Sequence, residues 1–313
     1  MTESEGTPQT IAASADSGFH LTKCAICDTV GNATELYEST MTEDHLNPVI
    51  FSARRLPDRI HYRMVKCNTC GLIRSDPVAD SSTLAHLYFD SQFDYDDEAD
   101  NIAQSYLRYL KKVGMSGRLL EVGCGNGFFL EYAETAGYTS IHGVEPSLDA
   151  IEKASPKIQP LIVNDIVRTG LFEPGSFDVI CMFQVLDHLP DPGTVLEECF
   201  ALLKPGGAIL SLNHDVNALS SKLLGERSPI VDVEHTYLYS KTTMRKLFEK
   251  YGFQIRQVGS ASNTYTLHYL TRLLPVPKGI KNRMLDFLAK SPVGRIKLTV
   301  RLGNLYLIGI KPV

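Results

Sequence analysis

The chain has 313 residues, of which 43% are apolar and 21% charged, and its formal net charge is −5 at pH 7. Such a composition is typical of a globular protein longer than one average domain, so we expect a core domain with an appendage. The acidic balance argues against general nucleic-acid binding, no stretch approaches the roughly 20 apolar residues of a membrane span, and the polar start is no signal peptide, so we expect a cytoplasmic protein with reduced thiols.

The N-terminal part is expected to hold a disordered tail and a small cysteine module. Residues 1–18 are rich in Ser, Thr, Ala and Glu and show no apolar periodicity, which is typical of disorder. Residues 19–75 contain two C-x-x-C pairs, formed by Cys24, Cys27, Cys67 and Cys70. Each pair can place two thiolates on one tetrahedral ion, so we expect a zinc-ribbon-like module with one structural Zn²⁺. Buried or redox-active thiols are the alternative.

Residues 76–114 are expected to connect this module to the next domain. Eight acidic residues and no Lys or Arg lie between residues 76 and 100, with four aromatic residues among them: Tyr88, Phe89, Phe93 and Tyr95. This segment is either a solvated linker or a lid whose aromatic rings close over a bound cofactor. Apolar residues then recur at helical spacing over 101–113, which predicts an amphipathic helix.

A glycine-rich turn gives the strongest functional signal. Apolar residues lead into Gly123, Gly125 and Gly127, and a helix-like stretch follows. This order predicts a buried strand, a tight turn without side chains and a helix N-terminus, where a ligand can approach the backbone closely. Glu145 ends the next strand-like segment, where a carboxylate can accept both hydroxyls of a ribose. The glycine turn and Glu145 together predict a bound cofactor that contains a nucleoside.

Two residues around this turn indicate the charge of that cofactor. Phe128 occupies the position at which the dinucleotide pattern G-x-G-x-x-G requires glycine, which disfavours a diphosphate and hence a nicotinamide oxidoreductase. The carboxylate of Glu121 would repel a phosphate but would favour a sulfonium or an ammonium group. We therefore expect a cationic cofactor without phosphate.

From roughly residue 115 to residue 313 the chain resembles the class I S-adenosylmethionine-dependent methyltransferases. Residues 121–127 resemble the first motif of that family, residues 177–189 its fourth strand with the following loop, and residues 203–210 the turn into its fifth strand. The resemblance implies an α/β, Rossmann-like sheet of seven strands. It also implies that the last strand, expected over 302–310, inserts antiparallel to its neighbours.

The same resemblance assigns a cofactor and its contacts. S-adenosyl-L-methionine is the implied cofactor, with Glu145 on the ribose and Asp165 on the adenine amino group. The implied contact residues are Glu121, Gly123, Cys124, Gly125, Gly127, Glu145, Pro146, Asp165, Ile166 and Phe183. The implied activity is methyl transfer. A catalytically inactive cofactor-binding or interaction protein is the alternative.

The four-cysteine module indicates a particular subset of this methyltransferase family. A subset of these methyltransferases, including sugar C-methyltransferases and enzymes of glycan and natural-product pathways, carries such a zinc module. We therefore expect a small-molecule acceptor, whose hydroxyl or else carbon belongs to a sugar, a glycan or a natural-product intermediate. The sugar C-methyltransferases continue into a further domain for which this chain is too short, so their reaction is not carried over. A nucleic-acid methyltransferase is disfavoured, because residues 183–186 lack the Asn/Asp-Pro-Pro-aromatic run that is used on bases.

Three histidines fall in loops beyond the expected carboxyl ends of the strands, where an acceptor should lie. His188 follows the fourth strand, His214 follows the fifth, and His235 precedes a helix expected over 241–251. The resemblance gives His188 a role in shaping the pocket. Our hypothesis is that His214 or His235 removes the proton of the acceptor.

An insertion at about 262–301 separates the last two expected strands. From residue 271 to residue 313 the chain has nine Lys or Arg and one acid, Asp286, and apolar residues alternate with this charge. A solvated cationic face is one interpretation. The other is a surface for an anionic substrate or for peripheral contact with an anionic membrane.

Overall fold

The structure is a computed structural model, and it describes residues 19–47, 50–51, 59–89, 98–274 and 276–313. The expected tail, residues 1–18, lies outside the described residues. So do Phe93 and Tyr95, two of the four aromatic residues of the acidic segment.

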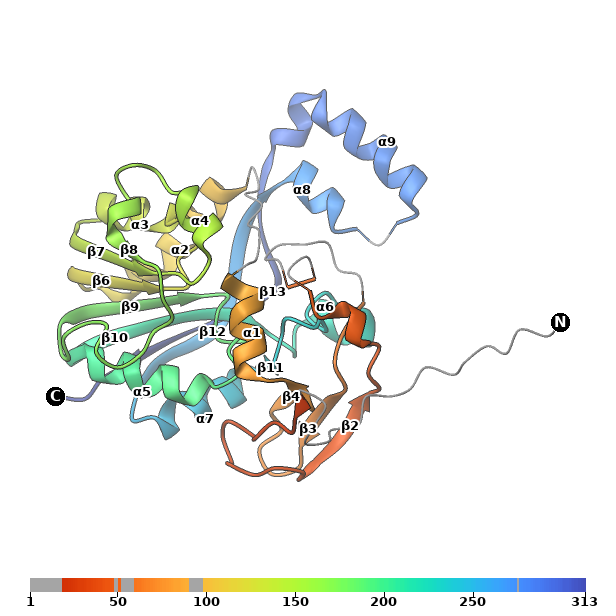
Figure 1. The fold of residues 1–313 in the computed structure, drawn as a ribbon. Coiled ribbons are helices and arrows are strands. Elements are labelled where there is room, and N and C mark those ends of the chain that lie inside the picture. The colour runs from red at the N-terminus through yellow and green to blue at the C-terminus, as the bar shows by residue number, and fades with distance from the viewer. Residues whose placement is uncertain (1–18, 48–49, 52–58, 90–97, 275) are drawn as a thin grey trace.

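A seven-stranded sheet forms the centre of the molecule, with the strand order β12-β13-β10-β9-β6-β7-β8 (Figure 1). Its strands are β6 (Gly117–Val122), β7 (Tyr138–Val144), β8 (Ile162–Val163), β9 (Phe177–Phe183), β10 (Leu203–His214), β12 (Gln254–Thr266) and β13 (Lys297–Ile310). Five neighbouring strands pair in parallel, in the order β10-β9-β6-β7-β8. Strand β13 is antiparallel to both of its neighbours, β10 and β12. The predicted Rossmann-like sheet with an antiparallel last strand is therefore confirmed.

The register of this sheet brings the ends of four parallel strands to one edge. Val122 of β6 pairs with Val144 of β7 and with Met182 of β9, and Leu212 of β10 pairs with Phe183 of β9. The loops that follow these strands therefore leave the sheet side by side. This is the edge at which open α/β sheets bind their ligands.

Helices cover both faces of the sheet (Figure 1). They are α2 (Ala99–Val113), α3 (Phe128–Thr135), α4 (Leu148–Glu152), α5 (Pro192–Leu202) and α7 (Lys241–Lys250). Alternate residues of a strand point to opposite faces. Leu119 and Leu210 accordingly pack with α2, α3 and α4, while Leu120 and Ile209 pack with α5 and α7. The amphipathic helix expected over 101–113 is α2.

The N-terminal segment builds a small antiparallel sheet that includes a strand of the larger domain. Its order is β11-β4-β3-β2, with the strands β2 (Ala33–Tyr37), β3 (Met64–Cys67), β4 (Ile73–Ser75) and β11 (Tyr237–Leu238). Tyr237 pairs with Arg74, and its hydroxyl donates a hydrogen bond to the carbonyl of Lys23 over 2.8 Å. The cysteine module is therefore joined to the chain around residue 237 rather than hanging from a linker.

Part of the acidic segment is folded into this N-terminal region. The segment contains β5 (Val78–Ala79), which pairs with β1 (Phe19–His20), and α1 (Ser81–Phe89). Leu84 and Leu87 of α1 are buried in a cluster with Val233 of the larger domain. A solvated linker therefore does not describe residues 78–89, because they pack against both domains. The lid hypothesis depends on residues 90–97, which lie outside the described residues.

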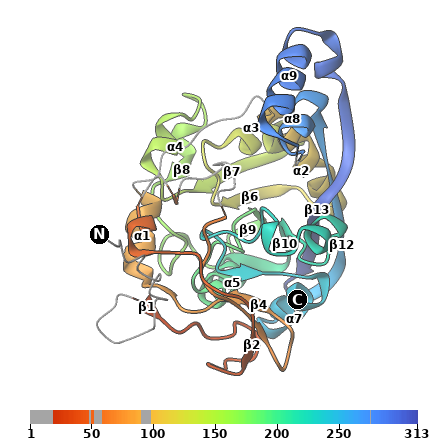
Figure 2. The same cartoon turned by 90° about the vertical axis from the view of Figure 1, so that its right-hand side faces the viewer.

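The insertion between the last two strands is a pair of helices that projects from the body of the molecule (Figures 1 and 2). These are α8 (Leu267–Arg272) and α9 (Lys278–Ala289), followed by the 3₁₀ turn η4 (Pro292–Arg295). The expected limits of 262 and 301 were too wide, because β12 continues to Thr266 and β13 begins at Lys297. At the base of the projection, the buried Glu98 carboxylate accepts hydrogen bonds from the backbone N–H and the hydroxyl of Thr266.

Short elements complete the fold: η1 (Glu43–His45), η2 (Gln159–Leu161), α6 (Leu219–Leu224) and η3 (Gly225–Arg227). Among the described residues, no helix has both the length and the apolar content that crossing a bilayer requires.

Candidate active site

The glycine turn after β6 has the backbone shape that the sequence predicts. Gly123, Gly125 and Gly127 have φ values of 68°, 56° and 69°, a region in which other residues are strained. A Cβ atom on Gly123 would lie 2.5 Å from a methyl group of Val185, and one on Gly127 would lie 2.4 Å from a methyl group of Ile158. Glycine is therefore required at both positions by conformation and by space.

Glu145, at the end of β7, supports this turn. Its Oε2 atom accepts a hydrogen bond from the N–H of Gly125 over 2.8 Å, and its Oε1 atom accepts one from the N–H of Ser147 over 2.9 Å. Burial raises the pKa of Glu145, although the two backbone donors act in the opposite direction. A carboxylate offers about four lone-pair sites, so both oxygens can accept ribose hydroxyls in addition.

Glu121 is a buried acid, and among the described residues one of its oxygens has no hydrogen-bond partner. Its side chain is 2% exposed, and Oε2 has no hydrogen-bond partner among the described residues. Burial, and after it the negative charge of Glu145, raises the pKa of Glu121 well above its ordinary value. A buried polar group without a partner costs about 1–3 kcal/mol, which a cationic ligand would offset. These two acids therefore fit S-adenosyl-L-methionine, whose methionine part carries a sulfonium and an ammonium group.

The aromatic and sulfur side chains near the turn are packed into the protein. Phe183, at the end of β9, stacks on Tyr106 of α2 with 4.2 Å between the ring centroids. Cys124 is buried, and burial raises the pKa of its thiol well above the ordinary value, so it is a neutral packing group. Contact of Phe183 and Cys124 with the cofactor stays a prediction.

The residues predicted to meet the adenine lie after β8. The Asp165 carboxylate accepts hydrogen bonds from the guanidinium of Arg168 at 2.7 Å and from the N–H of Ile166 at 2.8 Å. Ile166 is exposed, and the carbonyl of Pro146 accepts a hydrogen bond from the Asn164 side chain over 2.8 Å. Asp165 is therefore already paired with a cation. Its contact with an adenine amino group stays a prediction.

All three predicted histidines meet in one cluster at the carboxyl ends of β9 and β10. The ring centroids of His188 and His235 are 4.7 Å apart, and those of His214 and His235 are 5.2 Å apart. Asp187 lies among them, with Oδ1 3.9 Å from Nε2 of His188 and Oδ2 4.0 Å from Nε2 of His235. The loop that carries Asp187 also carries Val185, which packs on the glycine turn, so the cluster adjoins the cofactor site.

Hydrogen bonds from several elements fix the orientation of these rings. Nδ1 of His235 lies 2.9 Å from the carbonyl of Ile230, and Nδ1 of His214 lies 3.1 Å from Oδ1 of Asn304. The carbonyl of His235 accepts a hydrogen bond from the Ser75 hydroxyl of the N-terminal module over 2.9 Å. The small sheet therefore helps to position a residue of the candidate active site.

Burial controls the charge of the cluster. It lowers the pKa of His188 to about 4, against the opposing influence of Asp187, and it lowers the pKa of His214 as well. Burial acts to raise the pKa of Asp187, but the imidazoles around it outweigh this and lower it. At neutral pH the cluster therefore combines a carboxylate with the neutral imidazoles of His188 and His214.

Two residues of this cluster, Asp187 and Asn213, were not predicted from the sequence. Asp187 is 2% exposed, and its Oδ1 atom accepts a hydrogen bond from Nδ2 of Asn213 over 2.8 Å. Gln184, at the start of the same loop, has a φ of 56°, which is rare for a residue other than glycine. The position of Asp187 directly before a histidine was the only signal in the sequence, and Asn213 had none beyond its place at a strand end.

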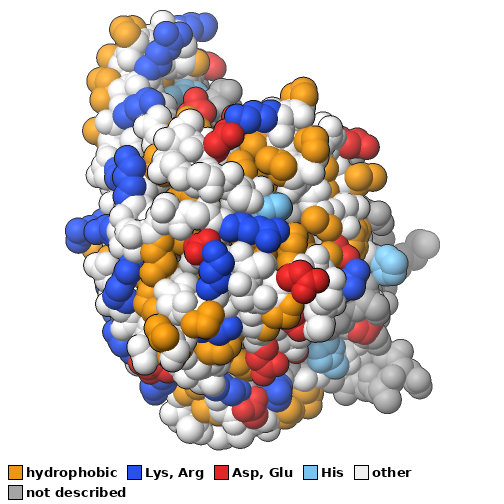
Figure 3. Space-filling model, turned by 90° about the vertical axis from the view of Figure 1, so that its left-hand side faces the viewer, with side chains coloured by type: hydrophobic (Ala, Val, Ile, Leu, Met, Phe, Trp, Pro, Cys, Tyr) orange, Lys and Arg blue, Asp and Glu red, His pale blue; other side chains and the backbone are white. Residues whose placement is uncertain are grey.

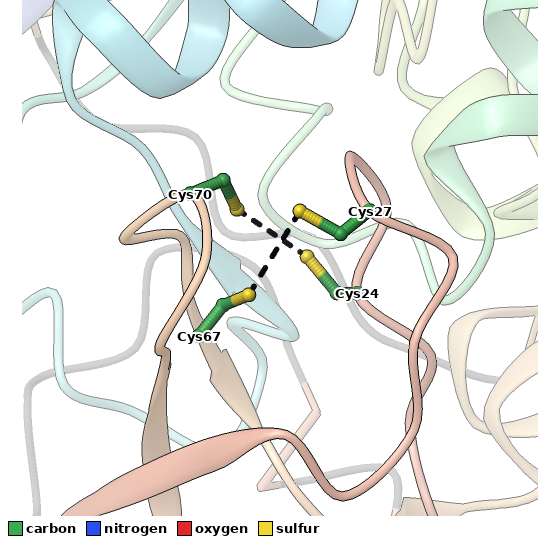
Figure 4. A group of neighbouring side chains, drawn as sticks. All are labelled: Cys24, Cys27, Cys67 and Cys70. Carbon is green, nitrogen blue, oxygen red and sulfur yellow. Dashed lines mark hydrogen bonds between the residues drawn. The ribbon is translucent and has the colours of Figure 1, made fainter.

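The four predicted zinc ligands converge on one point (Figure 4). Sγ of Cys24 lies 3.5 Å from Sγ of Cys70, and Sγ of Cys67 lies 4.0 Å from Sγ of Cys27. Thiolates that are each about 2.3 Å from a tetrahedral zinc ion lie roughly 3.8 Å apart, so the geometry fits. Burial opposes ionisation of Cys67, but backbone N–H groups around it lower its pKa to about 6.

Comparison with known proteins supports the interpretation of the glycine turn and its acids as a methyltransferase site. Residues 94–258, more than half of the chain, match the family described as a methyltransferase domain. The chain is 26% identical over 167 residues to a ubiquinone biosynthesis O-methyltransferase of Albidiferax ferrireducens, covering 49% of this chain and 65% of that protein. It is 32% identical over 136 residues to one of Ralstonia nicotianae, covering 41% and 56%. The match thus spans less than two thirds of these curated relatives.

A solved structure shares the fold. This structure is a complex between the Haloferax volcanii Trm112 methyltransferase activator and a methyltransferase. One of its chains superposes on this protein with a TM-score of 0.50 and 16% sequence identity, covering 69% of this chain and 92% of that chain. The glycine turn, the paired acids and the strand order agree with the family match. The chain therefore belongs to the class I S-adenosylmethionine-dependent methyltransferases.

Proposed function

We propose that this protein transfers a methyl group from S-adenosyl-L-methionine to a hydroxyl oxygen of a small-molecule acceptor. The observation that carries the proposal is the histidine cluster, which adjoins the glycine turn through the loop from Val185 to His188. The relatives are named as O-methyltransferases, which favours oxygen over carbon as the acceptor atom.

The cofactor supplies an electrophilic methyl group that is displaced in line, so the protein has mainly to position the acceptor and remove its proton. The glycine turn and Glu145 would hold the nucleoside, and Glu121 would face the methionine part. A neutral imidazole near the acceptor hydroxyl can take the proton as the new C–O bond forms. Imidazoles whose pKa burial lowers, those of His188 and His214, lie at the carboxyl ends of β9 and β10, and they support this role.

His214 is the stronger candidate for this base. Its Nδ1 atom is engaged with Asn304, which leaves Nε2 to accept a proton, and burial keeps the ring neutral by lowering its pKa. Nε2 of His235 instead faces the carboxylate of Asp187. His235 is therefore better placed to orient Asp187 than to remove the proton of the acceptor. From the sequence alone, the two histidines were equal candidates for the base.

The test is methyl transfer from labelled S-adenosyl-L-methionine to a panel of phenols, aliphatic alcohols and sugar nucleotides, with His214→Gln beside the wild type. We expect His214→Gln to lower kcat by about 100-fold or more, with unchanged affinity for the cofactor. His20→Gln is the control, because His20 is an exposed residue of β1. Unchanged kcat in His214→Gln would exclude His214 as the base.

The acceptor panel also tests the finer expectation drawn from the sequence. A sugar, glycan or natural-product hydroxyl stays a prediction, since the relatives' names give it no support. Methylation of sugar nucleotides alone would favour it. Methylation of phenols alone would assign the protein to another acceptor class.

We further propose that Cys24, Cys27, Cys67 and Cys70 hold one structural Zn²⁺. Four thiolates fill a tetrahedral ion and leave no position for a substrate. The ion would link the loop before β2 to the turn between β3 and β4. It would thereby stabilise the sheet that includes β11 and adjoins His235.

We also propose that the α8–α9 projection contacts anionic membranes. Ile280, Met284 and Phe287 lie at helical spacing along α9 and are exposed, Phe287 to 66%. Lys281 and Arg283 lie between them in the sequence, and Figure 3 shows hydrophobic and cationic side chains interleaved on the projecting part at its top. Exposed apolar residues on a cationic amphipathic helix are typical of a helix that lies in a membrane interface.

A further inference from the structure

We propose that Asp187, His188 and His235 form a binding site for a divalent transition-metal ion, separate from the four-cysteine cluster and beside the acceptor. The inference extends the proposed function, because it gives the histidine cluster a second role in that same reaction. It rests on the positions of three ligand atoms and on the way the surrounding chain holds them.

The three residues offer one carboxylate oxygen and two imidazole nitrogens at a common point. All three ligand atoms lie within 4.8 Å of one another. Two ligands that are each about 2.1 Å from a shared ion lie roughly 3–4.2 Å apart, depending on the coordination angle. Oδ2 of Asp187 lies 4.0 Å from Nε2 of His235, which falls in this range, and Nε2 of His188 lies 3.9 Å from Oδ1 of the same carboxylate.

These separations are too long for hydrogen bonds. Nitrogen and oxygen atoms that share a proton lie about 2.7–3.2 Å apart. Oδ2 of Asp187 is buried and has no hydrogen-bond partner among the described residues, although Nε2 of His235 is the atom that faces it. A cation between the oxygen and the nitrogen would satisfy both atoms, which direct contact at this distance does not.

The surroundings orient each ligand as in known metal sites. Histidines that bind metals usually use their second nitrogen to bond a carbonyl or a carboxylate, which turns the other nitrogen to the ion. Nδ1 of His235 meets the carbonyl of Ile230 at 2.9 Å, and His188 is hydrogen-bonded to the backbone of Glu234. Oδ1 of Asp187 accepts a hydrogen bond from Asn213, which leaves Oδ2 for the ion.

The ligand set also indicates which ions would bind. Two histidines and one carboxylate on one side of an ion favour divalent first-row metals such as Mn²⁺, Fe²⁺, Co²⁺ and Zn²⁺, and they leave coordination positions open. The side chain of His188 is 24% exposed, so the cluster is reachable from outside. An acceptor oxygen could therefore enter one of the open positions.

In the reaction such an ion would act as a Lewis acid beside the acceptor hydroxyl. The O–H bond would break with transfer of the proton to Nε2 of His214, whose ring lies 5.2 Å from that of His235. The oxygen electron pair would then form the bond to the methyl carbon, and the C–S bond would break with its electrons going to sulfur. The ion would stabilise the negative charge that develops on the oxygen and would not change its oxidation state.

The test is a titration with Mn²⁺ of the full-length protein that carries one equivalent of Zn²⁺ for its four-cysteine cluster and no further zinc, followed by electron paramagnetic resonance in the absence of cofactor and acceptor. Mn²⁺ prefers oxygen and imidazole ligands to thiolates, so the four-cysteine cluster does not compete for it. We expect one Mn²⁺ per chain, with nitrogen couplings from bound imidazole. Asp187→Asn and His235→Gln should each weaken binding by about tenfold or more, and His20→Gln should not.

Two outcomes would overturn the proposal. One is that folded wild-type protein binds neither Mn²⁺ nor Co²⁺ beyond the ion of the cysteine cluster. The other is that binding is unchanged in both ligand variants while their circular dichroism matches the wild type. If a variant does not fold, the nitrogen couplings in the wild type decide the question. Because the titration needs no methyl transfer, a failed acceptor assay would contradict the proposed function and leave this result standing.

Discussion

The cofactor turn and the histidine cluster lie at the same edge of one sheet, yet they are built in opposite ways. The turn comes from a single stretch, residues 121–127, and its shape depends on three glycines with positive φ values. The cluster combines side chains from the loop after β9, the end of β10 and the segment before β11, which the N-terminal module supports through Ser75. Damage to the backbone should therefore destroy the first site, whereas damage to distant packing should destroy the second.

The cofactor turn and the histidine cluster also differ in their electrostatics. The turn is bordered by the buried acids Glu121 and Glu145. Burial, and after it the charge of Glu145, raises the pKa of Glu121, and a cation beside these acids would stabilise their charged forms. The cluster pairs the Asp187 carboxylate with the imidazoles of His188 and His214, whose pKa values burial lowers. In the proposed function, the first region binds the positively charged cofactor and the second removes the proton of the acceptor.

The largest expected effect is on the turn. Gly123→Ala should lower the affinity for S-adenosyl-L-methionine by about 100-fold or more, because the residue combines a φ of 68° with a methyl group 2.5 Å from the new Cβ. Gly175→Ala is the matched control, since Gly175 has a φ of 64° but no atom of the described residues beyond its chain neighbours within 4 Å of its Cβ position. Calorimetric titration measures both. Equal losses in the two variants would mean that backbone strain alone, and not the fit of the turn, controls binding.

Zinc removal should affect the two regions unequally. Chelation is expected to lower the melting temperature by on the order of 5 °C or more, because the ion holds the small sheet together. Methyl transfer should fall more than cofactor affinity, since β11 and Ser75 connect that sheet to His235. Adding Zn²⁺ back is the control. A parallel loss of cofactor affinity and methyl transfer would contradict the idea that the module supports mainly the histidine cluster.

The pH dependence of the reaction should reflect the histidine cluster alone. A base must be neutral, so kcat should be constant at high pH and fall as the pH drops through the pKa of the base. Burial lowers the pKa of His214 from the ordinary value of 6.5, so the fall should be centred below pH 6.5. A pH profile of kcat at saturating substrate measures this. A midpoint above pH 7 would assign the proton transfer to a different group.

The smallest expected effect is at the projection, which touches neither region. Phe287→Ser should weaken sedimentation with vesicles containing phosphatidylserine by about threefold to tenfold, while turnover of a water-soluble acceptor stays unchanged. Leu148→Ser is the control, because Leu148 is also exposed but lies on α4, on the body of the molecule. Equal vesicle binding by the wild type and Phe287→Ser would contradict the membrane contact.

The same contrast explains what the sequence could and could not predict. The turn, Glu145 and the two C-x-x-C pairs were recognisable because their chemistry depends on residues close together in the chain. His188, His214 and His235 could be placed only in loops near one edge. The part played by Asp187 depends on side-chain positions that no spacing encodes, and the strand β11 was not expected because only two residues form it.

The most direct test of the whole account is a calorimetric titration of the zinc-replete protein with S-adenosyl-L-methionine, beside NADH. We expect micromolar binding of S-adenosyl-L-methionine that is lost in Glu145→Ala, and no binding of NADH, because Phe128 occupies the place where a diphosphate needs glycine. A folded protein that binds NADH, or that binds S-adenosyl-L-methionine equally well without the Glu145 carboxylate, would contradict the assignment of the site.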